Sequence, residues 1–368
     1  MNTILLKSVS FPGLGLDFDL NPTMFQIGSV RITWYGFLIA IGMLLAMAFA
    51  YWKAPSFGVN RDKLMDAGIG GIIGGIIGAR AYFVIFSWEN YKDDLLSIFK
   101  TWNGGMAIYG GLIGGLLVGL LIAKIRKIKI FPAIDLACMG FLIGQSIGRW
   151  GNFVNVEAFG GNTELPWGMT GPSITSYLQE HYSELNALGM DINPQSPVHP
   201  CFLYESLWCI LGFVLLFLYM KHRKFDGEIF LMYSAWYGAG RFVIEGLRTD
   251  SLLIGNIRVS QLLAGILVVA SVIVWIVVRG RIRARHDPEY LMLYVNTPAW
   301  KQECEEEAEK LRLYQEKRAA RKGVKPVNPE SATEVVEIED YPAEKQPETE
   351  ENTPKEAESE SDHNTEEK

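Results

Sequence analysis

Seven stretches of the chain are almost continuously apolar, and polar segments separate them. A helix needs roughly 20 apolar residues to cross the ~30 Å hydrocarbon core of a bilayer. The pattern therefore predicts seven transmembrane helices, at residues 31–52, 66–88, 105–124, 132–153, 201–220, 228–247 and 259–279. The fourth and the sixth of these stretches are the least hydrophobic.

Lysine and arginine follow every second predicted span. They cluster after the first, third, fifth and seventh stretches, beginning at Lys53, Lys124, Lys221 and Arg279. The connection from Val154 to Pro200, in contrast, has 47 residues and no Lys or Arg. Basic residues collect in cytoplasmic loops, so we expect an outward N-terminus, an inward C-terminus and this connection on the outer face.

The C-terminal part differs from the rest in charge. Residues 330–368 contain 15 acidic and 3 basic residues and carry a net charge of −12, whereas residues 1–329 carry about +5. Such a tail has too few large apolar residues to fold. We predict an all-α integral membrane protein in three parts: a transmembrane domain over 1–285, a charged cytoplasmic helix and linker over 286–325, with the helix at 301–322, and a disordered acidic tail over 326–368.

Cysteine spacing favours neither a disulfide framework nor a metal site. The four cysteines stand without a CxxC or other ligand spacing, at Cys138, Cys201, Cys209 and Cys304. Three of them fall in or beside apolar segments, where cysteine packs as a small hydrophobe.

Glycines recur at four-residue spacing in the second and third predicted spans, at Gly70, Gly74, Gly78, Gly111, Gly115 and Gly119. Small residues on one helix face let backbones approach closely in lipid. We interpret these faces as scaffold; a groove for lipid or substrate is the alternative.

Ionisable and amide side chains also lie in or beside the apolar helices, where a charge is costly unless it is paired or hydrated. The fourth span and the residues after it contain Asp135, Gln145, Arg149, Asn152, Asn155 and Glu157. The sixth span places three charges on one helical face, Arg241, Glu245 and Arg248. A third group runs from His199 to Glu205. Under the predicted topology all three groups lie at outer helix ends and can converge in one cavity.

The arginines favour an anionic ligand. Guanidinium groups match phosphate oxygens and stay charged when partly desolvated, so the implied substrate class is a phospholipid headgroup. The alternative is purely structural: Arg241 with Glu245, and Arg149 with Asp135 or Glu157, would be buried pairs that fix helix register.

These polar groups carry a resemblance to a known family. Residues 148–160, GRWGNFVNVEAFG, closely resemble the signature of prolipoprotein diacylglyceryl transferases. Residues 199–205 are similar to that family's HPxxLYE segment, and residues 240–248 to its RFxxExxR segment. Trp34-Tyr35-Gly36 and Asp135 also fit. The resemblance runs in order from about residue 30 to residue 280 and leaves the tail outside it.

The resemblance implies an enzyme that moves the diacylglyceryl group of phosphatidylglycerol onto the thiol of a lipobox cysteine in a prolipoprotein, releasing glycerol phosphate. This is the first step of bacterial lipoprotein maturation. The resemblance further implies a multi-pass protein of the bacterial plasma membrane, with the active site facing the outer leaflet and the tail in the cytoplasm. The expected partners are phosphatidylglycerol, prolipoprotein signal peptides carrying a lipobox cysteine, and membrane lipids, but no nucleic acid. No metal or organic cofactor is required, because the phosphodiester already supplies an activated leaving group.

The reaction assigns tasks to the polar residues. The thiol must lose its proton, the glyceryl carbon must be held in line, and charge on the departing phosphate must be stabilised. We expect Arg149 and Arg241 to hold the phosphate, and Asn152 and Asn155 to act as neutral hydrogen-bond donors. The glutamates Glu157, Glu205 and Glu245 could orient the arginines, bind glycerol hydroxyls or take the thiol proton. The expected catalytic residues are Arg149, Arg241, Glu245, Glu205 and Tyr109. The expected substrate-binding residues are Arg149, Asn152, Asn155, Glu157, Gly160, Tyr35 and Arg248.

The third span departs from the family pattern. Many members have His-Gly-Gly there, and the histidine is usually regarded as the base, whereas this chain has Tyr109-Gly110-Gly111. Tyrosine is a poor base at neutral pH, so we favour a hydrogen-bonding role for Tyr109. The alternatives are activation by nearby arginines, or proton transfer to Glu205 or Glu245. For His199 we favour capping or packing, and for Tyr35 an interfacial anchor and a lipid contact are both open.

Three other functions compete with this hypothesis. A transporter or flippase also has buried charges, but we detect no internal repeats and the polar motifs are biased to the outer side. A membrane phosphatase or phospholipase would call for a metal cluster or a Ser or His nucleophile. A noncatalytic scaffold has no use for Arg, Asn and Glu at these spacings.

Overall fold

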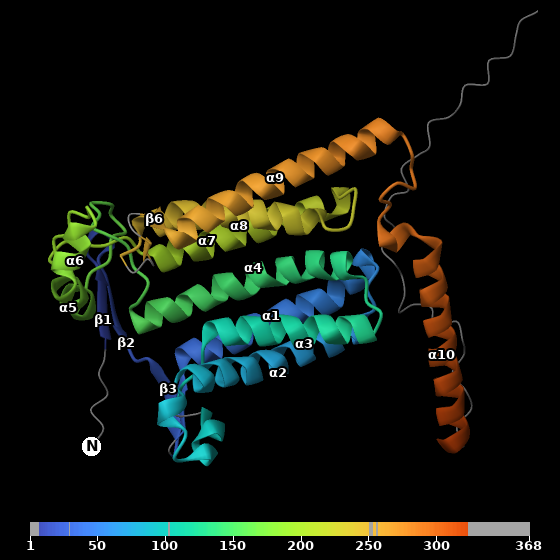
Figure 1. The fold of residues 1–368 in the computed structure, drawn as a ribbon, viewed down its shortest axis with the longest axis horizontal. Helices are drawn as coiled ribbons and strands as arrows, with labels where there is room; N and C mark the ends of the chain where they lie inside the picture. The colour runs from blue at the N-terminus through green and yellow to red at the C-terminus, as the bar shows by residue number, and fades with distance from the viewer. Residues whose placement is uncertain (1–6, 29, 102–103, 250–252, 255–256, 323–368) are drawn as a thin grey trace, which may run out of the picture. The chain divides into compact units, whose positions relative to one another are not determined.

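The chain folds into a bundle of long helices with small hairpins and short helices near its ends (Figure 1). The computed structural model describes residues 7–28, 30–101, 104–249, 253–254 and 257–322. The long helices are α1 (Trp34–Lys53), α2 (Arg61–Phe86), α3 (Ile108–Ile125), α4 (Ile130–Asn155), α7 (Cys201–Tyr219), α8 (Glu228–Leu247), α9 (Val259–Arg285) and α10 (Pro298–Lys322). The shorter elements are β1 (Lys7–Phe11), β2 (Leu16–Leu20), β3 (Thr23–Ile27), β4 (Val30–Thr33), α5 (Pro172–Glu180), α6 (Tyr182–Ala187), β5 (Leu253–Ile254), β6 (Ile257–Arg258), and the 3-10 helices η1 (Pro12–Leu14), η2 (Ala54–Phe57), η3 (Trp88–Asn90), η4 (Leu95–Phe99), η6 (Met220–His222) and η7 (Tyr294–Asn296).

Among the residues that the structure describes, six helices are long and apolar enough to cross a membrane: α1, α2, α3, α4, α7 and α9. The chain is therefore a multi-pass membrane protein, as predicted. The seventh expected span is α8, which has the predicted bounds but falls short in hydropathy because it contains Glu228, Arg241 and Glu245. It packs against α4, α7 and α9, which screen these charges from lipid. The number of seven spans stays a prediction.

The central helix is α4, which packs against α1, α7 and α8. Its buried face carries apolar side chains such as Leu136, Met139 and Leu142. The approach to α1 depends on glycine, since a Cβ on Gly42 would lie 3.2 Å from the Cα of Gly144. Because α4 contacts both α7 and α8, polar residues near its end can meet those of the other two helices.

The α2 and α3 helices meet through their glycine faces. A Cβ on Gly78 would lie 2.4 Å from the carbonyl oxygen of Gly110, and a Cβ on Gly74 would lie 2.7 Å from that of Gly114. Backbones this close leave no room for side chains between them. This packing supports the interpretation of the glycines as scaffold, because the partner helix fills each face.

Two tryptophans fix how α7 lies on α8. The rings of Trp208 and Trp236 stack with centroids 4.3 Å apart, and each indole N–H donates to the other residue's carbonyl, at 2.9 and 3.0 Å. Each ring lies against a glycine of the opposite helix, Gly240 or Gly212. Because Glu205 lies within one turn of Trp208, this packing determines which part of α8 faces Glu205.

The N-terminal hairpin and the long connection after α4 form a head module, which we define as residues 7–20 and 156–200. Strands β1 and β2 pair in antiparallel fashion, and Ser10 exchanges two backbone hydrogen bonds with Thr170, both of 2.8 Å. The core of the module includes Val9, Phe11, Phe159, Met169, Ile174, Leu178 and Val198.

The head module was not expected from the sequence. The chain is mostly helical, as predicted, but β1–β2, β3–β4 and β5–β6 are antiparallel hairpins. Residues 154–200 were expected to be a loop, yet they carry α5 and α6 and pack on β1. Local periodicity does not reveal this packing, because the strands are short and the core joins segments far apart in the sequence.

We call the end of the bundle where α2, α4 and α8 begin the basic end. Asp135 is fully buried there and accepts the N–H groups of Gly227 and Phe230, both at 2.8 Å, so that it caps α8 from a neighbouring helix. Asp135 was expected at the outer end beside Arg149. That expectation is wrong, because 14 residues of α4, or ~21 Å of helix rise, separate the two.

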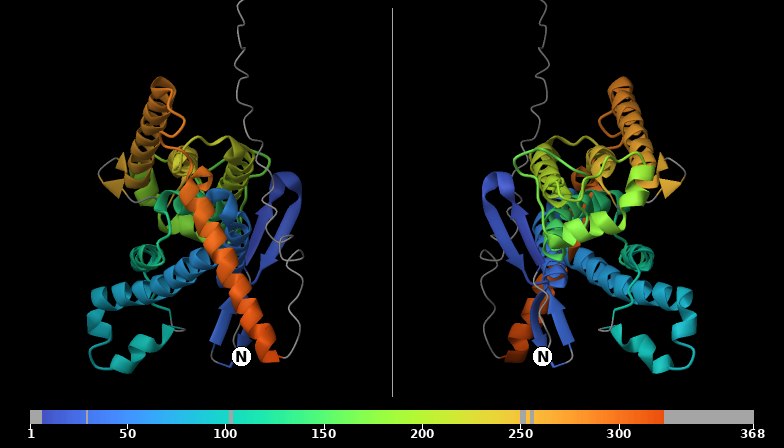
Figure 2. Two further views of the ribbon diagram at one scale, coloured as in Figure 1. Left: turned by 90° about the vertical axis from the view of Figure 1, so that its right-hand side faces the viewer. Right: turned by 90° about the vertical axis from the view of Figure 1, so that its left-hand side faces the viewer.

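The α10 helix runs across the basic end rather than along the bundle (Figures 1 and 2). It contains the charged helix predicted at 301–322 and begins a little earlier, at Pro298. The predicted acidic tail, residues 326–368, lies outside the described residues.

Candidate active site at the end of the bundle

Glu205 is the centre of a polar cluster at the opposite end of the bundle, which we call the site end. Its side chain is 5% exposed and has three arginines around it: Arg149 of α4 at 2.6 Å, Arg241 of α8 at 3.3 Å, and Arg248 just after α8 at 3.5 Å. Arg149 belongs to the motif group of the fourth predicted span, Arg241 and Arg248 belong to that of the sixth, and Glu205 belongs to the group at residues 199–205. The structure thus brings together residues that were predicted to converge.

Arg241 holds a second carboxylate as well. Its Nη2 lies 2.6 Å from Oε2 of Glu245, one turn further along α8, as the helical spacing predicted. Arg258, at the end of β6, donates to the backbone carbonyl of Glu245. Arg258 could not be predicted as a site residue from the sequence, because its contact with Glu245 joins β6 to α8.

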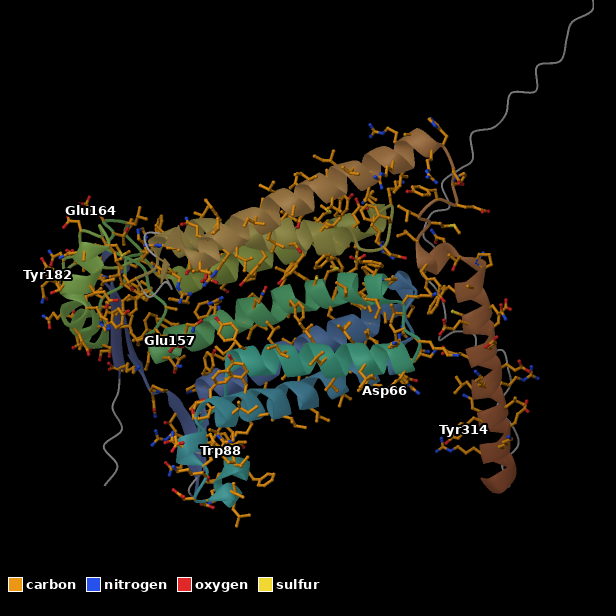
Figure 3. The ribbon with its side chains drawn as sticks, viewed as in Figure 1. Asp66, Trp88, Glu157, Glu164, Tyr182 and Tyr314 are labelled. Carbon is orange, nitrogen blue, oxygen red and sulfur yellow. The ribbon has the colours of Figure 1, made fainter. Side chains whose placement is uncertain are left out.

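A more exposed group extends the cluster from the end of α4. The side-chain amides of Asn152 and Asn155 both donate to Oε1 of Glu157, at 2.9 and 3.3 Å. Val156 ends α4 with a φ of 54°, and this left-handed residue turns Glu157 back toward the helix. Figure 3 shows Glu157 at this end of α4. Lys7 of β1 donates to the carbonyl of Asn155 at 2.5 Å, a contact that the sequence did not suggest.

Gly160 joins the site segments through its backbone. Its N–H donates to the carbonyl of His199 at 2.9 Å, and it forms an isolated antiparallel bridge with Arg248. A Cβ at this position would lie 2.8 Å from Cβ of His199 and 2.9 Å from the carbonyl oxygen of Leu247. Only glycine allows this approach, so Gly160 positions the segments around the cluster.

His199 packs at the edge of the site. Its Nδ1 lies 3.1 Å from the hydroxyl of Tyr204, which itself accepts the indole N–H of Trp167 at 2.8 Å. The hydroxyl therefore donates to Nδ1, which fits a neutral imidazole. Burial lowers the pKa of His199 and favours the same neutral form. These contacts agree with the packing role that the sequence favoured.

Tyr35, in the first turn of α1, packs its ring against α4 near the cluster. A Cβ on Gly151 would meet Cδ2 of its ring at 2.4 Å, so the ring covers the helix between Arg149 and Asn152. Nearby, Trp150 donates to Ser206 of α7 at 3.1 Å and ties the two helices together. The role of Tyr35 as a lipid contact stays a prediction.

Tyr109 is the expected site residue that the structure leaves apart. It lies in the first turn of α3, is 65% exposed, and belongs to a helix that packs mainly on α2. Across the described part of the chain, no hydrogen bond joins Tyr109 to Arg149 or Arg241. The hydrogen-bonding role of Tyr109 stays a prediction.

Arginines cluster around one carboxylate at this site. Among the residues that the structure describes, three guanidinium groups lie around Glu205, and Arg241 also pairs with Glu245. The side chains of Arg149 and Arg241 are 20% and 22% exposed, so an anion can reach them. Within the residues that the structure describes, no group of three or more His, Cys, Asp or Glu could hold a metal ion.

A family model matches most of the chain. Residues 22–277 fit the model described as prolipoprotein diacylglyceryl transferase. The chain belongs to this family. Proteins named phosphatidylglycerol–prolipoprotein diacylglyceryl transferase from Staphylococcus aureus strains JH9, Newman and bovine RF122 / ET3-1 are each 40% identical to it over 262 residues, which cover 70% of this chain and 90% of each relative.

The prolipoprotein diacylglyceryl transferase match separates the chain into two parts. The arginine cluster, with Tyr35, Tyr109 and Gly160, lies inside residues 22–277. Lys7 and β1 precede the match, and α10 follows it. The family therefore accounts for the site end of the bundle but not for α10.

Proposed function

We propose that the chain transfers the diacylglyceryl group of phosphatidylglycerol to the lipobox cysteine thiol of prolipoproteins and releases glycerol phosphate. The observation that carries the proposal is the group of three arginines around buried Glu205, two of which are about one fifth exposed. Guanidinium groups held together at the end of membrane helices repel one another, and a bound anion offsets this repulsion. The phosphodiester of a phospholipid supplies that anion at the right depth.

The transfer exchanges one bond to a glyceryl carbon for another. The cysteine sulfur attacks the glyceryl carbon that bears the phosphate, a C–S bond forms, and the bond from that carbon to the phosphate oxygen breaks. The electron pair leaves with glycerol phosphate, whose new negative charge must be stabilised. Arg149 and Arg241 perform this task, because a guanidinium binds phosphate oxygens in a fork and needs no reorganisation at the moment of reaction.

Glu205 acts on the reaction through the arginines. Held at 5% exposure, it fixes guanidinium groups that come from α4 and α8 and would otherwise repel each other. Gly160 holds the backbone segments around it, and Asn152 and Asn155 supply neutral donors toward the headgroup. In this arrangement the helices provide a rigid frame and the substrate phosphate completes the charge balance.

Glu157 is the carboxylate best placed to accept the thiol proton. It is exposed, and two neutral amides hold one of its oxygens. Glu205 and Glu245 instead bind arginines at 2.6 Å. Glu157→Gln keeps the size and the amide contacts but cannot take up a proton, so we expect transfer to regain rate when the reaction is supplied with a more acidic thiol substrate. Unchanged transfer in Glu157→Gln would exclude this role.

The site opens toward the outer leaflet of the bacterial plasma membrane. The charge pattern of the loops supports this orientation, since basic residues gather at the opposite end of the bundle. The signal peptide of the prolipoprotein presents its cysteine at the same surface. The tail after α10 is then cytoplasmic.

The proposal is tested by incubating the purified full chain with phosphatidylglycerol and a peptide that carries a lipobox cysteine. Mass spectrometry should detect a diacylglyceryl adduct on the peptide and glycerol phosphate in solution. Replacing the peptide cysteine by serine should abolish the adduct, and Arg149→Ala should reduce it at least about a hundredfold, as for loss of a charge-stabilising donor. Folded protein that gives no adduct with any anionic phospholipid would overturn the proposal.

A further inference from the structure

The first half of α10 is docked on the basic end of the bundle. Trp300 is buried, and Glu303 and Glu307 both form ion pairs with Lys63 at the start of α2. Asn60, which caps α2, donates to Glu307. These contacts come from successive turns of one face of α10, because residues three or four apart share a helix face.

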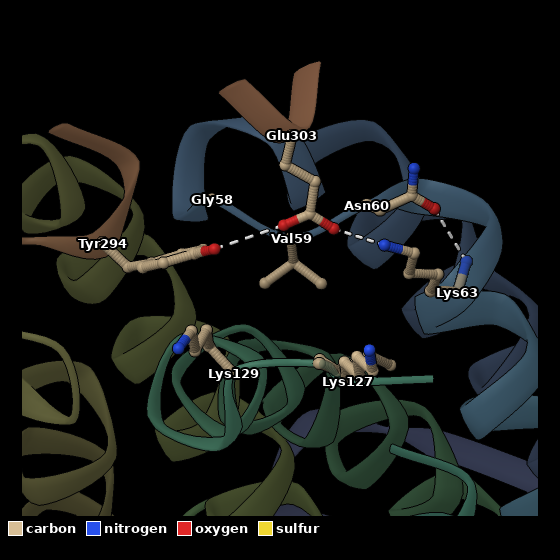
Figure 4. Close-up of a pocket in the computed structure, with 9 residues that line it drawn as sticks. Gly58, Val59, Asn60, Lys63, Lys127, Lys129, Tyr294 and Glu303 are labelled. Carbon is tan, nitrogen blue, oxygen red and sulfur yellow. Dashed lines mark hydrogen bonds and ion pairs between the residues drawn. The ribbon is translucent and has the colours of Figure 1, made fainter. Parts of the chain in front are cut away.

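The docking continues in the chain segment before α10. The N–H of Tyr294 donates to Asp226 at 2.8 Å, and its hydroxyl donates to Glu303 at 3.2 Å. Figure 4 shows Glu303 between Tyr294 and Lys63, with Lys127 and Lys129 across a small pocket. A carboxylate among three lysines holds this part of α10 by charge as well as by packing.

The second half of α10 has no such cover. All residues from Lys310 to Arg318 are exposed, and the helix continues past the ends of the bundle helices in both views (Figures 1 and 2). The docked face nevertheless continues along it. Because successive residues of a helix are turned by 100°, Leu311, Tyr314 and Arg318 lie on the same side of α10 as Glu307.

That continued face lies on the same side of α10 as its contacts with the bundle. The transmembrane helices end or begin at the basic end, and the docked face of α10 is turned toward those helix ends. Lipid headgroups must flank the bundle at the same level. Leu311 and Tyr314, 58% and 62% exposed, are therefore presented to the headgroup layer; Tyr314 is labelled in Figure 3.

We propose that the second half of α10 binds the anionic lipid surface beside the basic end, so that this half of the helix lies on the membrane surface. The charge of the helix changes sign where the cover ends. Residues 301–309 contain five glutamates, whereas residues 310–318 contain Lys310, Arg312, Lys317 and Arg318 with one glutamate. Leu311 and Tyr314 enter the interface, and the basic side chains bind lipid phosphates.

Two leucines of α10 provide a matched test. Leu311 and Leu313 are both exposed, but helical geometry turns them about 200° apart, so only Leu311 lies on the proposed lipid face. Leu311→Cys and Leu313→Cys, each with Cys304→Ser, are labelled with one fluorophore in the full chain. The other cysteines are buried. The protein is placed in nanodiscs of phosphatidylcholine with or without phosphatidylglycerol, and quenching by a headgroup-attached nitroxide is measured.

We expect quenching at position 311 to exceed that at 313 severalfold in anionic nanodiscs, and to fall toward the value at 313 in neutral nanodiscs or at 1 M salt, where charges are screened within about 3 Å. Glu303→Lys, which undocks the first half, should lower quenching at 311. Equal quenching at the two positions, or quenching at 311 that ignores lipid charge, would overturn the proposal. Protection of 311 from an aqueous quencher in lipid-free detergent would do so as well, because it would indicate a protein contact.

Discussion

The two ends of the bundle both bury carboxylates, but they use them differently. At the basic end, Asp135 accepts two backbone N–H groups, and Glu228 accepts hydrogen bonds from Trp275, Arg279 and Tyr219. The donors to these two carboxylates all belong to the fold. At the site end, Glu205 has three guanidinium partners, and the side chains of Arg149 and Arg241 are partly exposed.

The difference shows how to separate structural from functional buried charge in a membrane protein. A buried carboxylate is weak evidence of function by itself, since capping and ion pairing within the fold explain it. Several partly exposed arginines around one carboxylate, in contrast, form a site that an anion can enter. The transport hypothesis is weaker for the same reason, because Asp135 and Glu228 at the basic end serve in capping and helix pairing.

The strongest test neutralises one buried carboxylate at each end. Glu205→Gln should lower transfer at least about a hundredfold, because breaking a buried ion pair costs about 3–5 kcal/mol and frees three arginines to repel each other. Asp135→Asn leaves one N–H of the α8 cap without an acceptor. It should cost about 1–2 kcal/mol of stability and leave the turnover of folded protein unchanged.

Both variants are measured for transfer by mass spectrometry and for thermal midpoint in the same detergent. The proposed difference between the two ends would be contradicted if Asp135→Asn lost transfer activity while keeping the thermal midpoint of the wild type. It fails equally if Glu205→Gln transfers normally.

A gentler test makes the same substitution at both ends. Lysine keeps the charge of arginine but not its planar fork. Arg241→Lys should reduce transfer roughly ten- to a hundredfold, since each charge-assisted hydrogen bond contributes about 1.5–3 kcal/mol. Arg279→Lys, which changes contacts with Glu228 and Tyr219 at the basic end, should keep transfer and lower the thermal midpoint slightly. Equal losses of transfer would show that the site end has no special need for the fork.

Much of this contrast could be predicted from the sequence. Apolar length located the spans, and helical spacing placed Arg241 with Glu245 on one face. Topology then brought Arg149 and Glu205 to the same end. These inferences succeed because hydropathy and helical periodicity are local properties of the chain.

What the sequence could not predict depends on contacts between distant segments. Asp135 looks like one more intramembrane charge until α8 is seen to begin above it. Lys7 and Arg258 reach the site from a strand and a turn that have no strong local signal. The contact of Glu205 with three arginines likewise depends on the register of α7 on α8, which the stacked rings of Trp208 and Trp236 set.

The glycine junction gives a test of intermediate size. Gly160→Ala places a Cβ within 3.0 Å of His199, Leu247 and Cys201, and such overpacking costs about 1–3 kcal/mol. The strain separates α7 from the end of α8, so transfer should fall by about tenfold and the thermal midpoint with it. Gly161→Ala is the matched control, since its nearest neighbour would be 3.7 Å away. If the two variants behaved alike, the close approach at Gly160 would not matter for the site.

Tyr109→Phe should have the smallest effect, because Tyr109 lies apart from the arginines on exposed α3. Losing one neutral hydrogen bond to substrate costs about 0.5–1.5 kcal/mol, which is at most about tenfold in rate. Tyr82→Phe, on the neighbouring face of α2, is the control and should transfer at the wild-type rate. If Tyr109→Phe were as inactive as Arg149→Ala, the tyrosine would have to take part in proton transfer. The α2–α3 pair would then be part of the active site rather than its scaffold, and the site end would extend across the bundle.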